Sequence, residues 1–164
     1  MHEKGHIGAG LLLYAPFGFI VAALASLELA AAGGVAVASM AMVPDLDMKT
    51  PLVKHRGITH TVWFAVLVGF GFGALGALVG LEEGILATIL FSIIAFGFGT
   101  LTIISHLVAD ALTPMGVRPF APVRDDKFTL NWFKAANPIA NYALLGLGGL
   151  VAVAAIVAGT AIPI

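Results

Sequence analysis

The sequence predicts an all-α protein, a polytopic membrane bundle of about five transmembrane helices. Hydrophobic residues fill 60% of the 164 positions, only 10% are charged, and the mean hydropathy is +1.04. Soluble domains carry roughly a quarter charged residues, so this composition disfavours a soluble enzyme. Long apolar runs recur along the chain, and a helix of about 20 such residues spans a bilayer. We expect residues 1–164 to form one integral membrane domain.

Five apolar segments are predicted to be helices. Four are long enough to cross the membrane, at about residues 7–27, 58–79, 85–112 and 138–160. The other, at about residues 29–43, would rise only about 22 Å as a helix and is expected to be short or re-entrant. Glu28 is predicted to mark the turn before it. Glycines in the third and fourth segments predict close helix contacts, at Gly69, Gly71, Gly73, Gly76, Gly80, Gly97 and Gly99.

The charged residues predict the orientation. In a five-span topology all eight Lys and Arg fall on one side, whereas the opposite side carries only acidic residues. Basic residues mark the cytoplasmic side, so we expect a multi-pass protein of the cytoplasmic membrane with its N-terminus and both polar loops in the cytoplasm. The net charge of −1 provides no basic field to attract nucleic acid, which disfavours a nucleic-acid partner.

Histidine and aspartate residues gather at this predicted cytoplasmic face. They flank four of the segments, as His2, His6, Asp45, Asp47, His55, His60, His106 and Asp110. His106 and Asp110 are four residues apart on a helix, so both project from one face, where a bare carboxylate is costly in apolar surroundings. The chain has no Cys, so imidazoles and carboxylates would have to hold any metal. This ligand set suits Zn²⁺, Mn²⁺ or Fe²⁺ and is large enough for two ions.

Each of these residues also has an ordinary structural interpretation. His2 is a candidate for an interfacial anchor, Asp45 for a helix cap, and Asp110 for an ion pair with Arg118. Independent anchors should occur on both faces of the membrane, however, and the opposite face has no His and no Asp. Their convergence on one face therefore favours a shared metal site over separate structural roles.

Four short motifs carry a family resemblance. They are His6-Ile7-Gly8, Pro44-Asp45-Leu46-Asp47, His55-Arg56-Gly57-Ile58-Thr59-His60, and the run from His106-Leu107-Val108-Ala109-Asp110 to Gly116. Their order and spacing resemble the YdjM-like family of membrane-bound, metal-dependent hydrolases, over about residues 5–130. The resemblance implies a multi-span α-helical protein of the cytoplasmic membrane with a divalent-metal site. The implied ligands are His6, Asp45, Asp47, His55, His60, His106 and Asp110, with His2 as an additional candidate.

The predicted function is metal-dependent hydrolysis at the cytoplasmic membrane face, on a phosphate ester of a lipid or lipid-linked substrate. Zinc is the expected ion, with manganese and iron as alternatives. A divalent metal activates water and polarises the group under attack. Asp47 is the expected general base. Arg56 is predicted either to hold a phosphate with two hydrogen bonds or to anchor the membrane face. The loop at residues 114–137 mixes basic and aromatic residues, which predicts contact with membrane lipids or a lid over the site.

Two other functions stay open. A metal-ion or proton transporter could use the same His and Asp groups, but it would need ionisable residues through the depth of the membrane. A noncatalytic membrane protein could use a metal only to hold its helices together, as structural zinc sites do.

Overall fold

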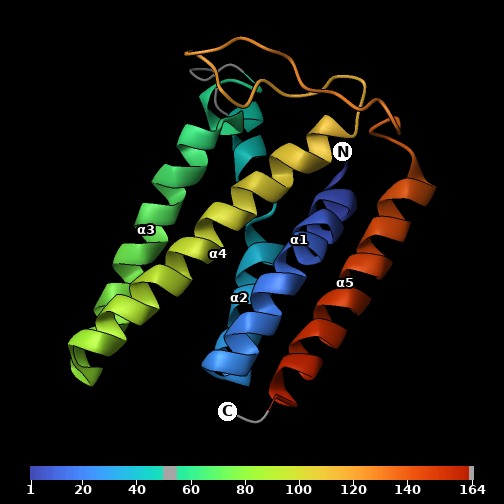
Figure 1. The fold of residues 1–164 in the computed structure, drawn as a ribbon. Helices are drawn as coiled ribbons and strands as arrows, with labels where there is room; N and C mark the ends of the chain where they lie inside the picture. Colours follow the sequence, from blue (N-terminus) through green and yellow to red (C-terminus); the bar gives the residue numbers. More distant parts are fainter. Residues whose placement is uncertain (50–54, 163–164) are drawn as a thin grey trace.

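The structure, a computed structural model, describes residues 1–49 and 55–162. It contains the helices α1 (Glu3–Leu24), α2 (Leu27–Met40), α3 (Val62–Gly80), α4 (Ile85–Ala111) and α5 (Pro138–Thr160), with short 3₁₀ helices η1 (Pro44–Lys49), η2 (Ile58–His60) and η3 (Leu81–Glu83) (Figure 1). All five long helices are apolar enough to cross a membrane, α2 only together with η1 as a span of 23 residues. The predicted all-α, five-span membrane bundle is confirmed.

The first turn between helices differs from the prediction. The chain turns at Ala25 and Ser26, and the Ser26 hydroxyl accepts a hydrogen bond from the Leu29 amide at 3.1 Å. Glu28 does not mark the turn, because it lies in the first turn of α2. A serine at the N-cap satisfies an otherwise unpaired amide, and an acidic residue in the first turn suits the positive end of the helix dipole.

The third helix also begins later than predicted. Residues 58–60 form η2, and α3 starts only after Thr61, whose side chain accepts a hydrogen bond from the Phe64 amide at 3.2 Å. The Val62 amide donates to the Pro119 carbonyl at 2.9 Å, so the loop after α4 contacts the start of α3. This arrangement holds η2 at the end of the bundle instead of inside a span.

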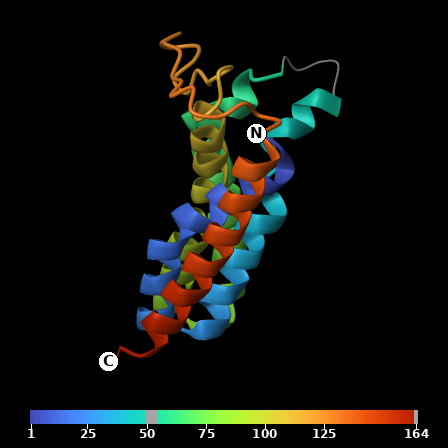
Figure 2. The ribbon, with the colours of Figure 1, turned by 90° about the vertical axis from the view of Figure 1, so that its right-hand side faces the viewer.

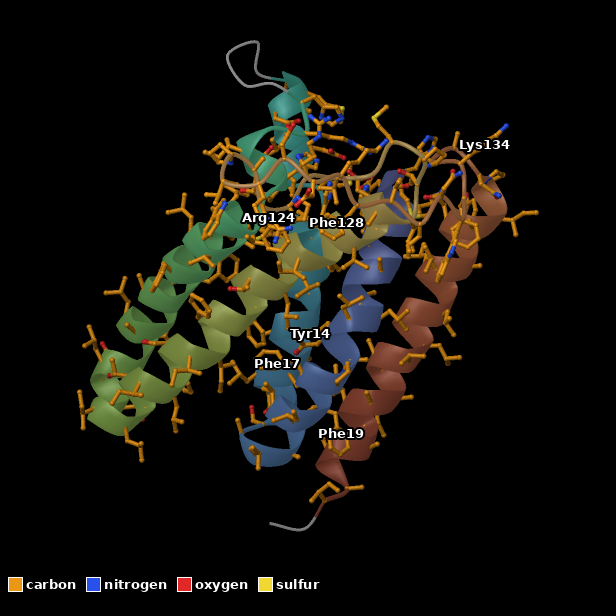
Figure 3. All side chains as sticks on the ribbon, turned by 45° about the horizontal axis from the view of Figure 1, so that its top comes forward. Tyr14, Phe17, Phe19, Arg124, Phe128 and Lys134 are labelled. Atoms are coloured by element: carbon orange, nitrogen blue, oxygen red, sulfur yellow. The ribbon has the colours of Figure 1, made fainter. Side chains whose placement is uncertain are left out.

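The bundle contains two closely packed helix pairs, α1 with α5 and α3 with α4, and α1 connects them. It packs along α5 and also contacts α2 and α4, while α4 packs along α3 (Figure 1). The start of α1, η1, η2, the end of α4 and the start of α5 lie at the same end of the bundle (Figure 2). The loop that carries Arg124, Phe128 and Lys134 covers this end (Figure 3). The fold therefore brings all the predicted site segments together.

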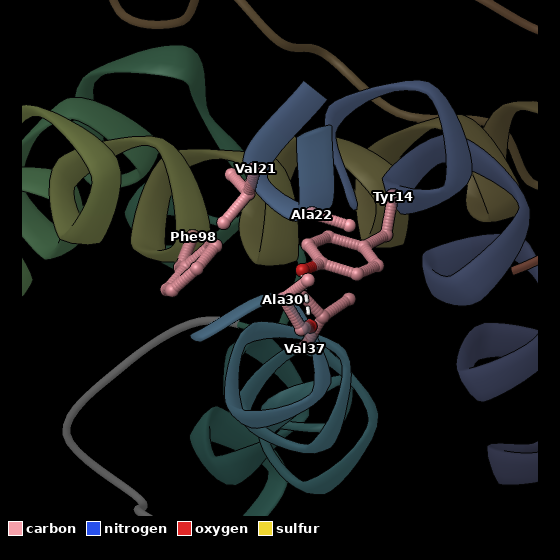
Figure 4. Packing of buried hydrophobic residues seen from close by; sticks show 6 residues of the cluster. All are labelled: Tyr14, Val21, Ala22, Ala30, Val37 and Phe98. Carbon is pink, nitrogen blue, oxygen red and sulfur yellow. Dashed lines mark hydrogen bonds between the residues drawn. The ribbon is translucent and has the colours of Figure 1, made fainter. Parts of the chain in front are cut away.

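An aromatic cluster packs α1 against α2 and α4 in the apolar part of the bundle. Tyr14 is fully buried against Ala30, Val37 and Phe98, and its hydroxyl donates to the Ala30 carbonyl at 2.5 Å (Figure 4). The hydrogen bond satisfies the one polar group of the tyrosine, which would otherwise be costly to bury in a membrane. The cluster fixes the position of α1 relative to α2 and α4.

Glycines let the paired helices approach closely. In α3 and α4 an added Cβ would meet the other helix of the pair at five of the seven predicted positions. At Gly97 it would meet Phe17 of α1 instead, and at Gly71 no atom of the described residues lies within 4 Å. In the other pair, a Cβ at Gly148 of α5 would lie 2.8 Å from the Gly8 carbonyl carbon of α1. Small residues of this kind are the common means of helix association in lipid.

Replacing Gly148 with valine should destabilise the protein by about 1–3 kcal/mol, because the added side chain must push α1 and α5 apart. The matched control is Gly149→Val on the same helix, where no atom of the described residues lies within 4 Å of the added Cβ. The stability of both variants is measured in detergent, as the temperature at which half of the protein is no longer monodisperse. Equal shifts in the two variants would contradict the close α1–α5 contact.

Candidate metal centre

Four elements supply the buried histidine and aspartate residues. The first turn of α1 carries His6, η1 carries Asp45 and Asp47, η2 carries His60, and the last turns of α4 carry His106 and Asp110. All six side chains are buried. The structure thus gathers residues from positions 6 to 110 of the chain into one cluster, as the sequence predicted.

Four acceptor atoms face one another at the centre of this cluster. The Nε2 atoms of His60 and His106 lie 3.2 Å apart. Oδ1 of Asp45 lies 3.2 Å from the first and 3.5 Å from the second. Oδ2 of Asp110 completes the group at 3.7 Å and 3.9 Å from the same two nitrogens.

The tautomers of the two imidazoles follow from their other ring nitrogens. Nδ1 of His106 donates to the Ala41 carbonyl at 2.7 Å. Nδ1 of His60 lies 3.0 Å from the Thr59 hydroxyl, which itself donates to Asp47 and so accepts from the ring. A neutral imidazole carries one proton, so both Nε2 atoms present lone pairs to the cluster centre.

These four atoms can hold a metal ion. Two imidazole lone pairs and two carboxylate oxygens repel one another unless a cation lies between them, and Oδ2 of Asp110 has no hydrogen-bond partner among the described residues. Ligands at about 2.0–2.1 Å from a tetrahedral ion lie about 3.3 Å apart, close to the spacing found here. Nitrogen and oxygen donors of this kind suit zinc, manganese or iron.

Asp47 lies behind His60 instead of beside the other acceptors. Its Oδ1 accepts from Nδ1 of His55 at 2.8 Å. Its Oδ2 accepts from the Thr59 hydroxyl at 2.7 Å and from the Arg56 amide at 3.1 Å. Both oxygens are therefore engaged, and Asp47 fixes the orientation of the ring of His60, as outer carboxylates commonly do for metal-ligating histidines.

His6 and His55 flank the four central atoms on different sides. The His6 ring stacks on His106 with centroids 3.8 Å apart, and its Nε2 lies 3.6 Å from Oδ1 of Asp110. Each flanking histidine belongs to a further group of three residues whose ligand atoms lie within 4.8 Å of one another. These groups are His6, Asp45 and His106, and Asp45, His55 and His60. The cluster thus offers candidate ligands for a second ion.

Cationic groups contact the outer oxygen of Asp110. The Arg56 guanidinium lies 2.9 Å from Oδ1 and also donates to the Gly116 carbonyl at 2.6 Å. The amine of Met1 donates to the same carboxylate oxygen at 2.8 Å. Arg56 reaches this position with a φ of +58°, a backbone conformation that non-glycine residues rarely adopt. These contacts compensate one oxygen of Asp110 and leave the other facing the cluster.

Two predicted residues lie outside the cluster. His2 is exposed and belongs to none of the candidate metal groups among the described residues. Arg118 does not pair with Asp110, because it lies 3.5 Å from the exposed Asp125, and Arg56 takes its expected place. Two contributors that the sequence did not reveal are the carbonyls of Ala41 and Gly116. Every residue has a carbonyl, so no sequence signal could single them out.

Comparison with known proteins identifies the family of this chain. No curated protein and no solved structure matches the chain significantly. The model of the YdjM inner membrane protein family matches residues 1–162, nearly the whole chain. This protein, with five apolar helices and a buried His and Asp cluster at one end of them, therefore belongs to the YdjM inner membrane protein family.

Proposed function

We propose that this chain is a metal-dependent hydrolase that cleaves a phosphate ester of a lipid or lipid-linked substrate at the cytoplasmic face of the membrane. The observation that carries the proposal is a group of four acceptor atoms. The Nε2 atoms of His60 and His106 lie 3.2 Å apart, and one oxygen each of Asp45 and Asp110 lies 3.2 to 3.9 Å from these nitrogens. Zinc is the proposed ion. The count of basic residues at this end supports the cytoplasmic orientation.

The four acceptors would hold the ion, and their neighbours would keep them in position. A bound divalent ion supplies Lewis acidity, which polarises a phosphoryl oxygen and lowers the pKa of a coordinated water. The Ala41 carbonyl and the pair of Thr59 and Asp47 hold the two imidazoles in the tautomer that this binding requires. Asp47 is in this proposal a positioning residue, because its oxygens are already engaged.

His55 is the residue best suited to move a proton. Its Nδ1 donates to Asp47 at 2.8 Å, so the lone pair lies on Nε2, and its side chain is 39% exposed. One of its ring nitrogens lies within 4.8 Å of ligand atoms of Asp45 and His60. An imidazole oriented by a carboxylate, beside a metal site and open to solvent, suits general acid–base catalysis.

Arg56 suits the binding of an anionic substrate. Its guanidinium already contacts Asp110 and the Gly116 carbonyl, and its buried Nε–H has no hydrogen-bond partner among residues 1–49 and 55–162. An unpaired buried donor is costly, and a substrate phosphate oxygen would satisfy it.

The distribution of ionisable residues argues against transport. No Asp, Glu, Lys, Arg or His occurs in residues 7–27, 29–44, 61–81, 84–105 or 138–164. A relay across the membrane would need such groups at intermediate depth. A purely structural metal stays the second candidate, since a closed site of four protein ligands is typical of structural zinc.

Metal content tests the binding part of the proposal. Purified protein should carry about one zinc, manganese or iron ion or more per chain, and a His60→Ala, His106→Ala double variant should lose it, since two of the four acceptors are gone. Inductively coupled plasma mass spectrometry measures the ions. His2→Ala is the matched control and should keep its metal. Absence of metal from the wild type, even after reconstitution with each ion, would contradict the proposal.

Hydrolysis tests the catalytic part. The zinc-loaded protein should hydrolyse chromogenic phosphate monoesters or diesters. His55→Ala should lower kcat by about 10²–10⁴-fold while retaining the ion at the four central acceptors, because it removes a proton-transfer group. Asp47→Asn should instead weaken metal binding by about 10–100-fold. Steady-state kinetics and metal titration separate the two effects. A metal-loaded wild type that hydrolyses none of these esters would favour the structural interpretation.

A further inference from the structure

We propose that a groove beside the metal centre binds an amphiphile with a phosphate headgroup, and that Lys4 recognises the phosphate. This inference rests on the proposed function and names the substrate's binding site. The groove has a volume of about 610 Å³, within the range of small-molecule sites. Its walls come from the start of α1, residues 42–48 after α2, and the start of α5.

The groove and the candidate metal centre share Asp45. Asp45 lines its wall and also belongs to the four central acceptors, so a molecule in the groove lies against a metal-binding carboxylate. The other three central residues, His60, His106 and Asp110, do not line the groove. A headgroup in this groove thus reaches the cluster at Asp45.

One part of the groove is polar and carries a positioned cation. Lys4 Nζ donates to the Tyr142 hydroxyl and lies over the ring of that tyrosine, 4.1 Å from its centroid. An ammonium group has three donors, so Lys4 can still donate to a phosphate oxygen. Glu3 and Asp45 are the acidic residues on the described wall.

Hydrogen bonds of Asn141 fix the polar wall of the groove. Asn141 is buried, its Oδ1 accepts from the His2 amide at 3.1 Å, and its Nδ2 donates to the Ala135 and Asn137 carbonyls at 2.9 Å and 2.7 Å. The start of α1 is thereby fixed against the start of α5. Lys4 and Tyr142 belong to these two helix starts, so their relative position is set before a ligand arrives, which lowers the entropic cost of binding.

The other part of the groove is apolar and reaches the lipid-facing surface. Met42, Met48 and Pro138 line it, and Met48 is 60% exposed. Ile139, beside Pro138 on α5, is 79% exposed on a helix that is apolar enough to cross the membrane. Methionine side chains adapt to irregular apolar ligands. A ligand with a charged head and an acyl chain matches both parts, whereas a soluble phosphate would use only the polar one.

Binding of a non-hydrolysable phosphonate analogue of dioleoyl phosphatidate tests this inference without relying on catalysis. Native mass spectrometry of the detergent-purified, metal-loaded protein measures the affinity for this analogue. Dioleoyl phosphatidylcholine, which has the same acyl chains, is the comparison lipid. Lys4→Ala should weaken binding of the phosphonate lipid about tenfold or more, the loss expected for a hydrogen bond to a charged group. Lys4→Arg should restore it.

The matched control is Lys127→Ala, which removes a lysine that donates to the Pro114 carbonyl in the loop between α4 and α5 and does not line the groove. It should change the affinity less than twofold. Met48→Asp should weaken binding of the phosphonate lipid as much as Lys4→Ala does, because it places a carboxylate in the apolar part of the groove. Glycerol 3-phosphate in large excess should not displace the lipid.

Three results would overturn the inference: equal losses in Lys4→Ala and Lys127→Ala, no preference over phosphatidylcholine, or displacement by glycerol 3-phosphate. Failure of the proposed function would look different. In that case the wild type would still bind the phosphonate lipid through Lys4 but would hydrolyse no phosphate ester. If the protein hydrolyses phosphate esters but its lipid binding does not depend on Lys4, the proposed function stands and the proposed binding groove is wrong.

Discussion

The structure at this end of the bundle depends on how the electrostatic repulsion among four buried acceptor atoms is compensated. The Nε2 atoms of two imidazoles lie 3.2 Å apart, and one oxygen from each of two carboxylates lies 3.2 to 3.9 Å from them, supplied by η1, η2 and α4. Such a group is costly to bury without a cation. The surrounding contacts orient the acceptors inward. The Ala41 carbonyl accepts a hydrogen bond from His106, and the Thr59 hydroxyl, held by Asp47, accepts one from His60. Arg56 forms an ion pair with the outer oxygen of Asp110.

The apolar bundle gives these contacts a fixed frame. Close approach of α1 and α5 at Gly8 and Gly148, and the buried Tyr14 between α1 and α2, set where the helix ends lie. Because the site residues lie at those ends, small changes in helix packing far from the cluster would alter the spacing of its acceptors. Stability in the membrane and the geometry of the site are therefore coupled through the same helices.

Much of this could be predicted from the sequence, because hydropathy and residue spacing act locally. The bounds of α5, and the convergence of Asp45, His60, His106 and Asp110, follow from apolar run lengths and a topology that brings segment ends together. Other features depend on tertiary contacts that no local pattern encodes. Asp47 cannot be separated from Asp45 by sequence, yet hydrogen bonds from His55 and Thr59 turn it away from the centre. Likewise Gly71 resembles its neighbouring glycines but faces no helix.

X-ray absorption at the zinc K-edge of the zinc-loaded protein tests the central claim most directly, because it reports the ligands of the ion itself. The account predicts nitrogen and oxygen neighbours at about 2.0–2.1 Å, with the multiple-scattering pattern of two imidazoles. That pattern should fall to one imidazole in a His106→Ala variant. A spectrum of oxygen neighbours alone, unchanged by that substitution, would show that zinc binds elsewhere and would contradict the account.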